Sequence, residues 1–248
     1  MKATMRTVSA MGWIAAVLVH RASVRFGSVA AASLATDQLA DRIGWDPAAA
    51  EVARGLAARL DAPLVVSGYS CLVIDLNRPL TSPESVPERS AGVPIPGNLG
   101  PTRQARAQRV VALFDPYHLA IARLLPKCAG RATLLFSIHS FTPVLGGEWR
   151  PWPVSVAGWH DRRLADGMLQ ALRLRGDLLV GENQPYGVDD VHDYTLPTHG
   201  EGRGIPCVMI EIRQDGLATP ADIQGWVERL AGACGDLAAD AAGLCSCL

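Results

Sequence analysis

Residues 133–143 read Thr-Leu-Leu-Phe-Ser-Ile-His-Ser-Phe-Thr-Pro, and this stretch decides the fold class. Apolar and small residues without a charge are typical of a strand covered on both faces, and the proline marks where the chain leaves the sheet. His139 therefore lies at the carboxyl end of a buried strand, where open α/β sheets keep their functional groups. An imidazole there can bind a metal or transfer a proton, although a lone histidine is more often a satisfied core residue.

On both sides of this stretch, apolar runs alternate with amphipathic segments. Strands are expected at 11–19, 62–66, 71–74, 176–180 and 204–212, and helices at 46–60, 103–125, 161–174 and 220–242, the second helix interrupted at Asp115-Pro116. Asp46 is expected to cap its helix, with Pro47 at the first helical position. The alternation predicts an α/β fold with a mostly parallel sheet and helices on both faces.

Length and composition favour one domain spanning residues 1–248. The 248 residues are 49% hydrophobic and 19% charged, which suits a single large core. Residues 81–101 are expected to form a long loop and 243–248 a flexible tail. The net charge of −1 gives no broad field that would attract nucleic acid or an acidic membrane, so the expected partner is a small molecule.

The six cysteines are scattered without the spacing of a disulfide framework, which predicts a reducing, cytoplasmic compartment. Cys245 and Cys247 could hold a metal or form a disulfide, but a chain end is more often frayed. Lys2 and Arg6 before the apolar run at 11–19 resemble a weak signal peptide, and a first core strand explains the same residues better. No stretch reaches the ~20 apolar residues that a membrane span needs.

Polar residues follow several of the expected strands. Asn77 and Arg78 could hold a carboxylate, or could form a turn with a surface arginine. Asn183 and Tyr186 lie in a turn that could also present donors to a ligand. Glu211 lies inside an apolar strand, where a carboxylate is costly to bury unless it is paired or protonated. It is either a general base or one half of a structural ion pair with Arg213 or Arg78.

Several motifs occur in order between residues 43 and 215. They read Ile-Gly-Trp-Asp-Pro at 43–47, Gly-Tyr-Ser-Cys-Leu-Val-Ile-Asp-Leu-Asn-Arg-Pro at 68–79, Pro-Tyr-His at 116–118, Ile-His-Ser-Phe-Thr-Pro at 138–143, Arg-Pro-Trp at 150–152, Asn-Gln-Pro-Tyr at 183–186 and Glu-Ile-Arg-Gln-Asp at 211–215. Together they resemble the N-formylglutamate amidohydrolase family.

The resemblance implies the three-layer α/β/α sandwich of zinc-dependent exopeptidases and hydrolysis of a small N-acyl amino acid. It implies one Zn²⁺ ion with His139, His20 and Asp46 as ligands, and Glu211 as the general base that moves the proton of the metal-bound water. Asn77 and Arg78 would hold the substrate carboxylate. Further substrate contacts would come from Asn183, Tyr186 and Arg213.

Three positions depart from the family pattern. Arg21 occupies the first expected ligand position, next to His20, and an arginine cannot bind a metal because it stays protonated. Arg42 replaces a histidine and Cys71 replaces an arginine. Two hypotheses therefore stay open: a metal-dependent amidohydrolase, and a metal-free pseudoenzyme or carboxylate-binding protein on the same fold. The first is favoured because His139, Glu211, Asn77 and Arg78 are retained.

Overall fold

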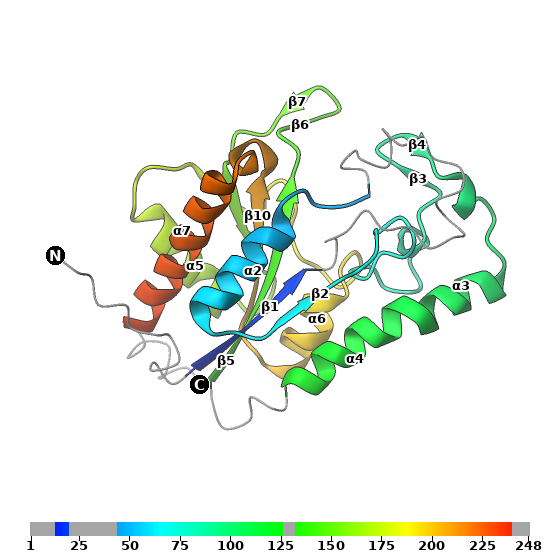
Figure 1. Ribbon diagram of the computed structural model, residues 1–248, viewed down its shortest axis with the longest axis horizontal. Coiled ribbons are helices and arrows are strands. Elements are labelled where there is room, and N and C mark those ends of the chain that lie inside the picture. Colours follow the sequence, from blue (N-terminus) through cyan, green and yellow to red (C-terminus); the bar gives the residue numbers. More distant parts are fainter. Residues whose placement is uncertain (1–12, 20–43, 126–131, 240–248) are drawn as a thin grey trace.

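The computed structural model describes residues 13–19, 44–125 and 132–239 (Figure 1). Its centre is a six-stranded sheet in the order β2-β1-β5-β10-β8-β9. The strands are β1 (Trp13–Val19), β2 (Leu64–Val66), β5 (Ala132–Phe141), β8 (Val154–Ala157), β9 (Val180–Glu182) and β10 (Cys207–Arg213). Neighbouring strands pair parallel except β8 and β10, which pair antiparallel. The α/β prediction is confirmed, and the sheet is mixed.

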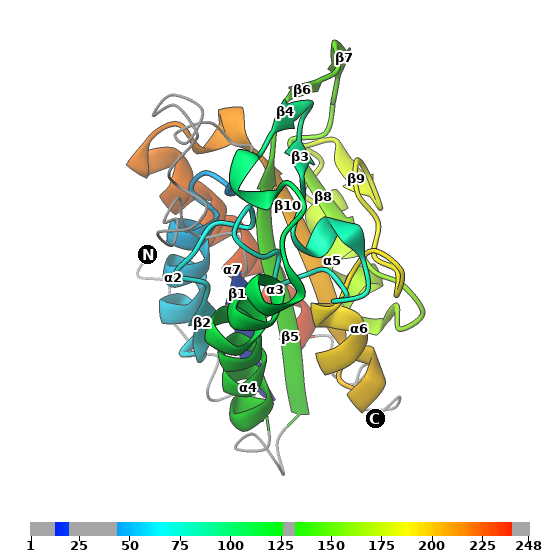
Figure 2. The same cartoon turned by 90° about the vertical axis from the view of Figure 1, so that its right-hand side faces the viewer.

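Two groups of helices pack on the sheet (Figure 2). Helices α2 (Ala49–Leu60), α5 (Arg163–Arg173) and α7 (Pro220–Ala239) share one apolar cluster with Phe136 and Ile138 of β5. Helices α4 (Asp115–Leu124) and α6 (Thr195–His199) share a second cluster with Leu135 and with Met209 of β10. Because side chains alternate along a strand, the residues of β5 divide between the two faces.

Close packing of α2 on α7 depends on Gly55. A Cβ atom at this position would lie 2.5 Å from Cγ2 of Val227, which is closer than carbon atoms can approach. The apolar side of α2, including Val52, Leu56 and Leu60, is buried in the apolar cluster that α7 also joins. A larger residue at position 55 would force the two helices apart.

The start of α2 differs from the prediction. The helix begins at Ala49, and its N-cap is Ala48 in the left-handed region at φ 59°, with no side chain capping it. Asp46 is therefore not the cap, and its carboxylate points instead toward β5. The Asp-Pro pair favoured a cap locally, but a long-range contact determines where the side chain goes.

The strand predicted at 71–74 is also wrong, because this apolar segment forms turns. Its carbonyl groups pair with side chains rather than with a neighbouring strand. Asn98 donates to the Leu72 oxygen at 2.8 Å, and Arg109 donates to the Val73 oxygen at 2.8 Å. The buried turns explain the apolar composition. In the second half of the chain, β9 begins only at Val180, and β8 was not predicted.

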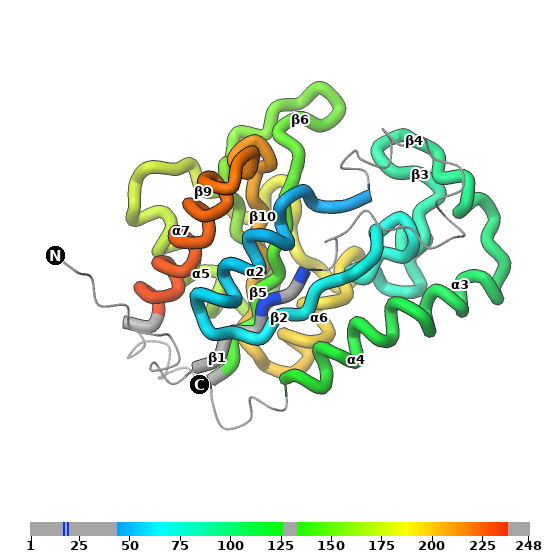
Figure 3. Tube along the Cα trace, viewed as in Figure 1, coloured from blue at the N-terminus to red at the C-terminus, as the bar shows by residue number. Residues whose placement is uncertain are grey.

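Residues 81–101 contain more structure than the predicted loop. Short 3₁₀ helices at Pro83–Ser85 and Pro96–Asn98 flank a hairpin of β3 (Arg89–Ser90) and β4 (Val93–Pro94). A second hairpin, β6 (Val144–Leu145) and β7 (Glu148–Trp149), follows β5. Figure 3 traces both hairpins beyond the carboxyl ends of the parallel strands. They provide walls for any site at that end.

The helix expected at 103–125 is continuous rather than interrupted. Helix α3 (Arg103–Arg109) passes through a π-helical turn at Val110–Phe114 into α4, which contains Pro116 at its start. A wider turn just before a proline gives its ring room that a regular α-helical turn lacks. Two further 3₁₀ helices, Glu201–Arg203 and Gln214–Leu217, follow directly after α6 and β10. Among the described residues, no helix has the length and apolar character needed to cross a bilayer.

Candidate active site

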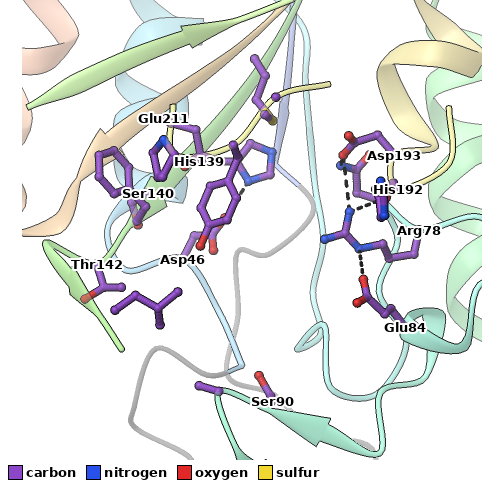
Figure 4. Close-up of a pocket in the computed structure, with 18 of the residues that line it drawn as sticks. Asp46, Arg78, Glu84, Ser90, His139, Ser140, Thr142, His192, Asp193 and Glu211 are labelled. Atoms are coloured by element: carbon purple, nitrogen blue, oxygen red, sulfur yellow. Dashed lines mark hydrogen bonds and ion pairs between the residues drawn. The ribbon is translucent and has the colours of Figure 1, made fainter. Parts of the chain in front are cut away.

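A cavity of about 550 Å³ lies at the carboxyl ends of β5 and β10. Most of its residues come from these two strands, from residues 77–91 and from the loop at 185–193. Figure 4 shows His139, Asp46 and Glu211 on one side, with Arg78, His192 and Asp193 on the other. The lining residues are Asp46, Asn77, Arg78, Glu84, Ser90, Ala91, His139, Ser140, Phe141, Thr142, Leu145, Pro185, Tyr186, Gly187, Asp189, His192, Asp193, Met209, Glu211 and Gln214.

His139 and Asp46 form a buried pair in this cavity. Nδ1 of His139 lies 2.7 Å from Oδ2 of Asp46, and Nε2 lies 3.0 Å from the Ser137 hydroxyl oxygen. Because a carboxylate only accepts, Nδ1 carries the proton in this arrangement and Ser137 can donate to Nε2. Both side chains are less than a tenth exposed. The carboxylate therefore fixes the orientation and tautomer of the imidazole.

Glu211 lies next to His139 on the neighbouring strand. The two residues are register partners in the parallel pairing of β10 with β5, so their side chains leave the same face of the sheet. Glu211 is 5% exposed, and it lines the cavity together with His139. A carboxylate in this position can take a proton from a water molecule held in the cavity and return it to a leaving group. His139 and Glu211 therefore converge on one cavity, as the roles implied by the resemblance require.

The opposite wall carries Arg78 with acidic partners. Its Nε lies 3.3 Å from Glu84, Nη1 lies 3.7 Å from Asp193, and Nη1 also donates to the main-chain oxygen of His192. Burial raises the pKa of Asp193, which the nearby Arg78 partly opposes. The Asp189 carboxylate bonded to His192 raises the pKa of that imidazole. The Arg78 guanidinium thus faces the cavity with its charge shared between two carboxylates.

Asn77 lies beside Arg78, but most of its polar groups are engaged. Its Nδ2 donates to Asp193 at 2.5 Å, and its Oδ1 accepts from the Thr195 main-chain N–H at 2.9 Å. Asn77 is 7% exposed. Its side chain attaches the segment that carries Arg78 to the start of α6, and one N–H of its amide is left over for a ligand.

The remaining predicted site residues are distributed differently. Tyr186 lines the cavity, and its hydroxyl accepts from Arg150 at 3.2 Å. Asn183 is not among the lining residues, and its Oδ1 accepts from the Gly158 main-chain N–H. Arg213 is not among them either, because it pairs with Asp215 and lies 4.7 Å from the centre of the Trp149 ring. Neither residue lines the cavity, and their role in substrate binding stays a prediction.

Most of the positions that depart from the family pattern lie outside the described residues. His20, Arg21 and Arg42 lie outside the described residues. Cys71 is buried, and its main-chain N–H donates to the Gly44 oxygen at 3.3 Å, outside the cavity lining. Cys245 and Cys247 also lie outside the described residues.

Four titratable lining residues were not predicted: Glu84, Asp189, His192 and Asp193. Four titratable residues within the five positions 189–193 were the available signal, but such a run usually indicates a solvated loop. Only the fold brings this loop to Arg78.

Asp46 and His139 offer oxygen and nitrogen donors of the kind that zinc accepts. Across 13–19, 44–125 and 132–239, no group of three or more His, Cys, Asp or Glu side chains is arranged to hold a metal ion. Asp46 and His139 are thus compatible with two ligands of a zinc ion, and the described residues do not supply the rest of such a site.

Residues 17–218 match the family model described as N-formylglutamate amidohydrolase. Gene product Atu2144 from Agrobacterium tumefaciens has a similar structure, with a TM-score of 0.88, 33% identity, and coverage of 95% of this chain and 94% of that one. An N-formylglutamate amidohydrolase from Ralstonia eutropha JMP134 shares the fold, with a TM-score of 0.63, 16% identity, and coverage of 90% and 92%. No curated protein sequence matches the chain.

Proposed function

The chain belongs to the N-formylglutamate amidohydrolase family and is an amidohydrolase, and we propose that it hydrolyses the amide bond of a small N-acyl amino acid. The products would be the acyl acid and the free amino acid. The observation that carries this proposal is that His139 and Glu211, neighbours on adjacent strands, line one cavity and the guanidinium of Arg78 lies across from them.

The chain's own residues supply binding and proton transfer. Arg78 would bind the carboxylate of the substrate through its guanidinium, which suits a carboxylate geometrically. A water oxygen then adds to the amide carbonyl carbon while Glu211 takes one of its protons. As the C–N bond breaks, Glu211 passes that proton to the leaving nitrogen. The net change is addition of one water across the amide bond.

A divalent metal ion, Zn²⁺, would be held by Asp46 and His139, with His20 as the third expected ligand. The pair supports this role because both donors are buried and already face each other. When bound, such an ion would polarise the substrate carbonyl and lower the pKa of a water molecule. Its binding would displace the proton that Nδ1 of His139 shares with Asp46.

Several finer features support the same assignment. Helices on both faces of the sheet support the three-layer sandwich of zinc-dependent exopeptidases. The cavity of about 550 Å³ suits a small molecule, and N-formylglutamate is the substrate that the family name indicates. A cytoplasmic location stays a prediction from the scattered cysteines.

A panel of N-formyl, N-acetyl and N-succinyl amino acids, assayed with added Zn²⁺, tests the proposal. Release of free amino acid, measured by amine-reactive fluorescence, is expected for at least one acyl series. Addition of a chelator should suppress that release. Comparing the release with and without chelator separates the role of the metal from the amidohydrolase activity itself. If no compound of the panel is cleaved, with or without metal, the proposed substrate class is wrong.

A further inference from the structure

Two buried histidines lie outside the cavity and take no part in the chemistry above. His118 belongs to the Pro-Tyr-His motif on α4, and His199 is the last residue of α6. They are 7% and 3% exposed. Nδ1 of His118 lies 3.0 Å from Nε2 of His199, and the ring planes are 13° apart. This geometry is a direct hydrogen bond between two imidazoles.

The direction of this bond follows from its other end. Nε2 of His118 lies 2.9 Å from the main-chain oxygen of Leu76. A carbonyl oxygen only accepts, so Nε2 of His118 carries a proton. Its Nδ1 must then accept, since burial lowers the pKa of His118 to about 3 and keeps the ring neutral. His199 therefore donates from its own Nε2, and burial likewise lowers its pKa to about 4.

The histidine chain ends on the peptide group that joins Leu76 to Asn77. His118 donates to the carbonyl oxygen of this peptide group. The N–H of the same peptide group, which belongs to Asn77, donates to Oδ1 of Asp75 at 2.9 Å. Both polar ends of the peptide group are thus fixed. Rotation of this peptide group would break the hydrogen bond at its oxygen and the one at its N–H. The restraint acts close to Arg78, which lies two residues after Leu76.

Helix α6 closes the network into a ring. At its start, the N–H groups of Tyr194 and Thr195 donate to the main-chain oxygen and to Oδ1 of Asn77, both at 2.9 Å. At its end, His199 donates to His118, which holds Leu76. The short helix is therefore tied at both ends to the segment that carries Asn77 and Arg78.

We infer that His118 and His199 are positioning residues for the substrate clamp formed by Asn77 and Arg78. The pair acts through hydrogen bonds to the main chain and contacts no substrate. Because both rings are neutral, they hold the segment without adding a charge that would compete with Arg78 for a carboxylate. This inference rests on the proposed function, in which Arg78 binds the substrate carboxylate.

Three variants test the inference. His118→Phe fills the space but removes both hydrogen bonds. His118→Gln can donate from its amide nitrogen to Leu76 and accept from His199 with its amide oxygen. Tyr117→Phe is the matched control, because it changes a buried ring on the same helix and removes only a hydroxyl that has no hydrogen-bond partner among the described residues.

Steady-state kinetics with N-formyl-L-glutamate separates positioning from a purely structural role. A loosened clamp should raise KM on the order of ten- to hundredfold in His118→Phe, with a much smaller change in kcat. His118→Gln should restore most of the affinity, and Tyr117→Phe should match the wild type. If KM is unchanged in His118→Phe, or if His118→Gln is as impaired as His118→Phe, the inference is overturned.

Amide hydrogen exchange gives a readout that needs no substrate. The N–H groups of Tyr194 and Thr195 should lose protection in His118→Phe and keep it in His118→Gln. Unchanged protection in His118→Phe would overturn the inference even if the wild type proved inactive. A wild type that cleaves nothing while protection changes as expected would instead count against the proposed function alone.

Nitrogen-15 NMR of the wild type covers the case in which His118→Phe does not fold. At pH 7, both rings should be neutral with the proton on Nε2. A proton on Nδ1 of either ring, or a doubly protonated ring, would contradict the hydrogen-bond chain.

Discussion

Nδ1 of His139 lies 2.7 Å from Oδ2 of Asp46, which joins the end of β5 to the residue just ahead of α2. The contact spans 93 positions of the chain and is almost fully buried. A buried carboxylate and imidazole of this kind either form a structural pair or share a metal ion. The two roles make different predictions for the same substitutions.

Asp46→Asn is expected to weaken zinc binding by at least roughly tenfold, because it removes the charge of a ligand. Protein purified without chelator should carry zinc, and titration with a competing chelator would measure its affinity. Asp236→Asn, at an exposed carboxylate paired with Arg175, is the control and should bind zinc like the wild type. Equal zinc affinity in Asp46→Asn and the wild type would show that the pair is structural only.

Glu84→Gln is expected to lower KM for N-formyl-L-glutamate about two- to fivefold, because it removes an exposed carboxylate that competes for Arg78. The control is Glu88→Gln in the same segment, whose side chain accepts from the Gly100 main-chain N–H instead. A higher KM in Glu84→Gln would mean that Glu84 holds Arg78 in place rather than competing with the substrate.

The buried histidine pair makes the free energy of unfolding depend on pH. The pKa values of His118 and His199 fall from 6.5 to about 3 and about 4 in the folded chain. As the pH drops below 6.5, the unfolded chain binds protons before the folded chain does, so stability must fall. Urea midpoints at pH 7, 6, 5 and 4 should decrease more steeply for the wild type than for His118→Gln. Parallel curves would contradict neutral burial of His118.

Much of the catalytic side of the cavity could be predicted from the sequence. His139 and Glu211 each end or interrupt an uncharged apolar run, and such runs form the central strands of an α/β sheet. Because β5 and β10 are parallel neighbours, their polar residues meet at one end. The two apolar runs, together with the rule that parallel strands end at the same edge of a sheet, were sufficient to place these two residues.

The partners of these residues could not be predicted in the same way. Asp46 precedes a proline and a helix, so local patterns indicated a cap, whereas its contact with His139 depends on how α2 packs on β5. The apolar residues at 71–74 fill buried turns whose carbonyl groups pair with Asn98 and Arg109. A short apolar run in the sequence fits a buried strand and a buried turn equally well, because neither has a periodicity that separates it from the other.

The far wall of the cavity was the least predictable part. Asp193 and His192 lie in a polar loop that reads as solvent-exposed, and Glu84 lies in a proline-rich segment. Each contacts Arg78 only because α6 and the 3₁₀ helix at Pro83–Ser85 are folded against the same segment. Such contacts follow from tertiary packing, not from spacing along the chain.

The most direct measurement is the rate of free amino acid release from N-formyl amino acids by Glu211→Gln and the wild type, side by side with added Zn²⁺. We expect the wild type to release product and Glu211→Gln to be slower by roughly 10²- to 10⁴-fold, since only the proton-transferring group is lost. Zinc content and thermal stability should stay unchanged, as they should in the surface control Glu228→Gln, which alters only exposed contacts with Arg59 and Gln224. Turnover by Glu211→Gln at the wild-type rate would contradict the assignment of Glu211 and His139 as the centre of catalysis.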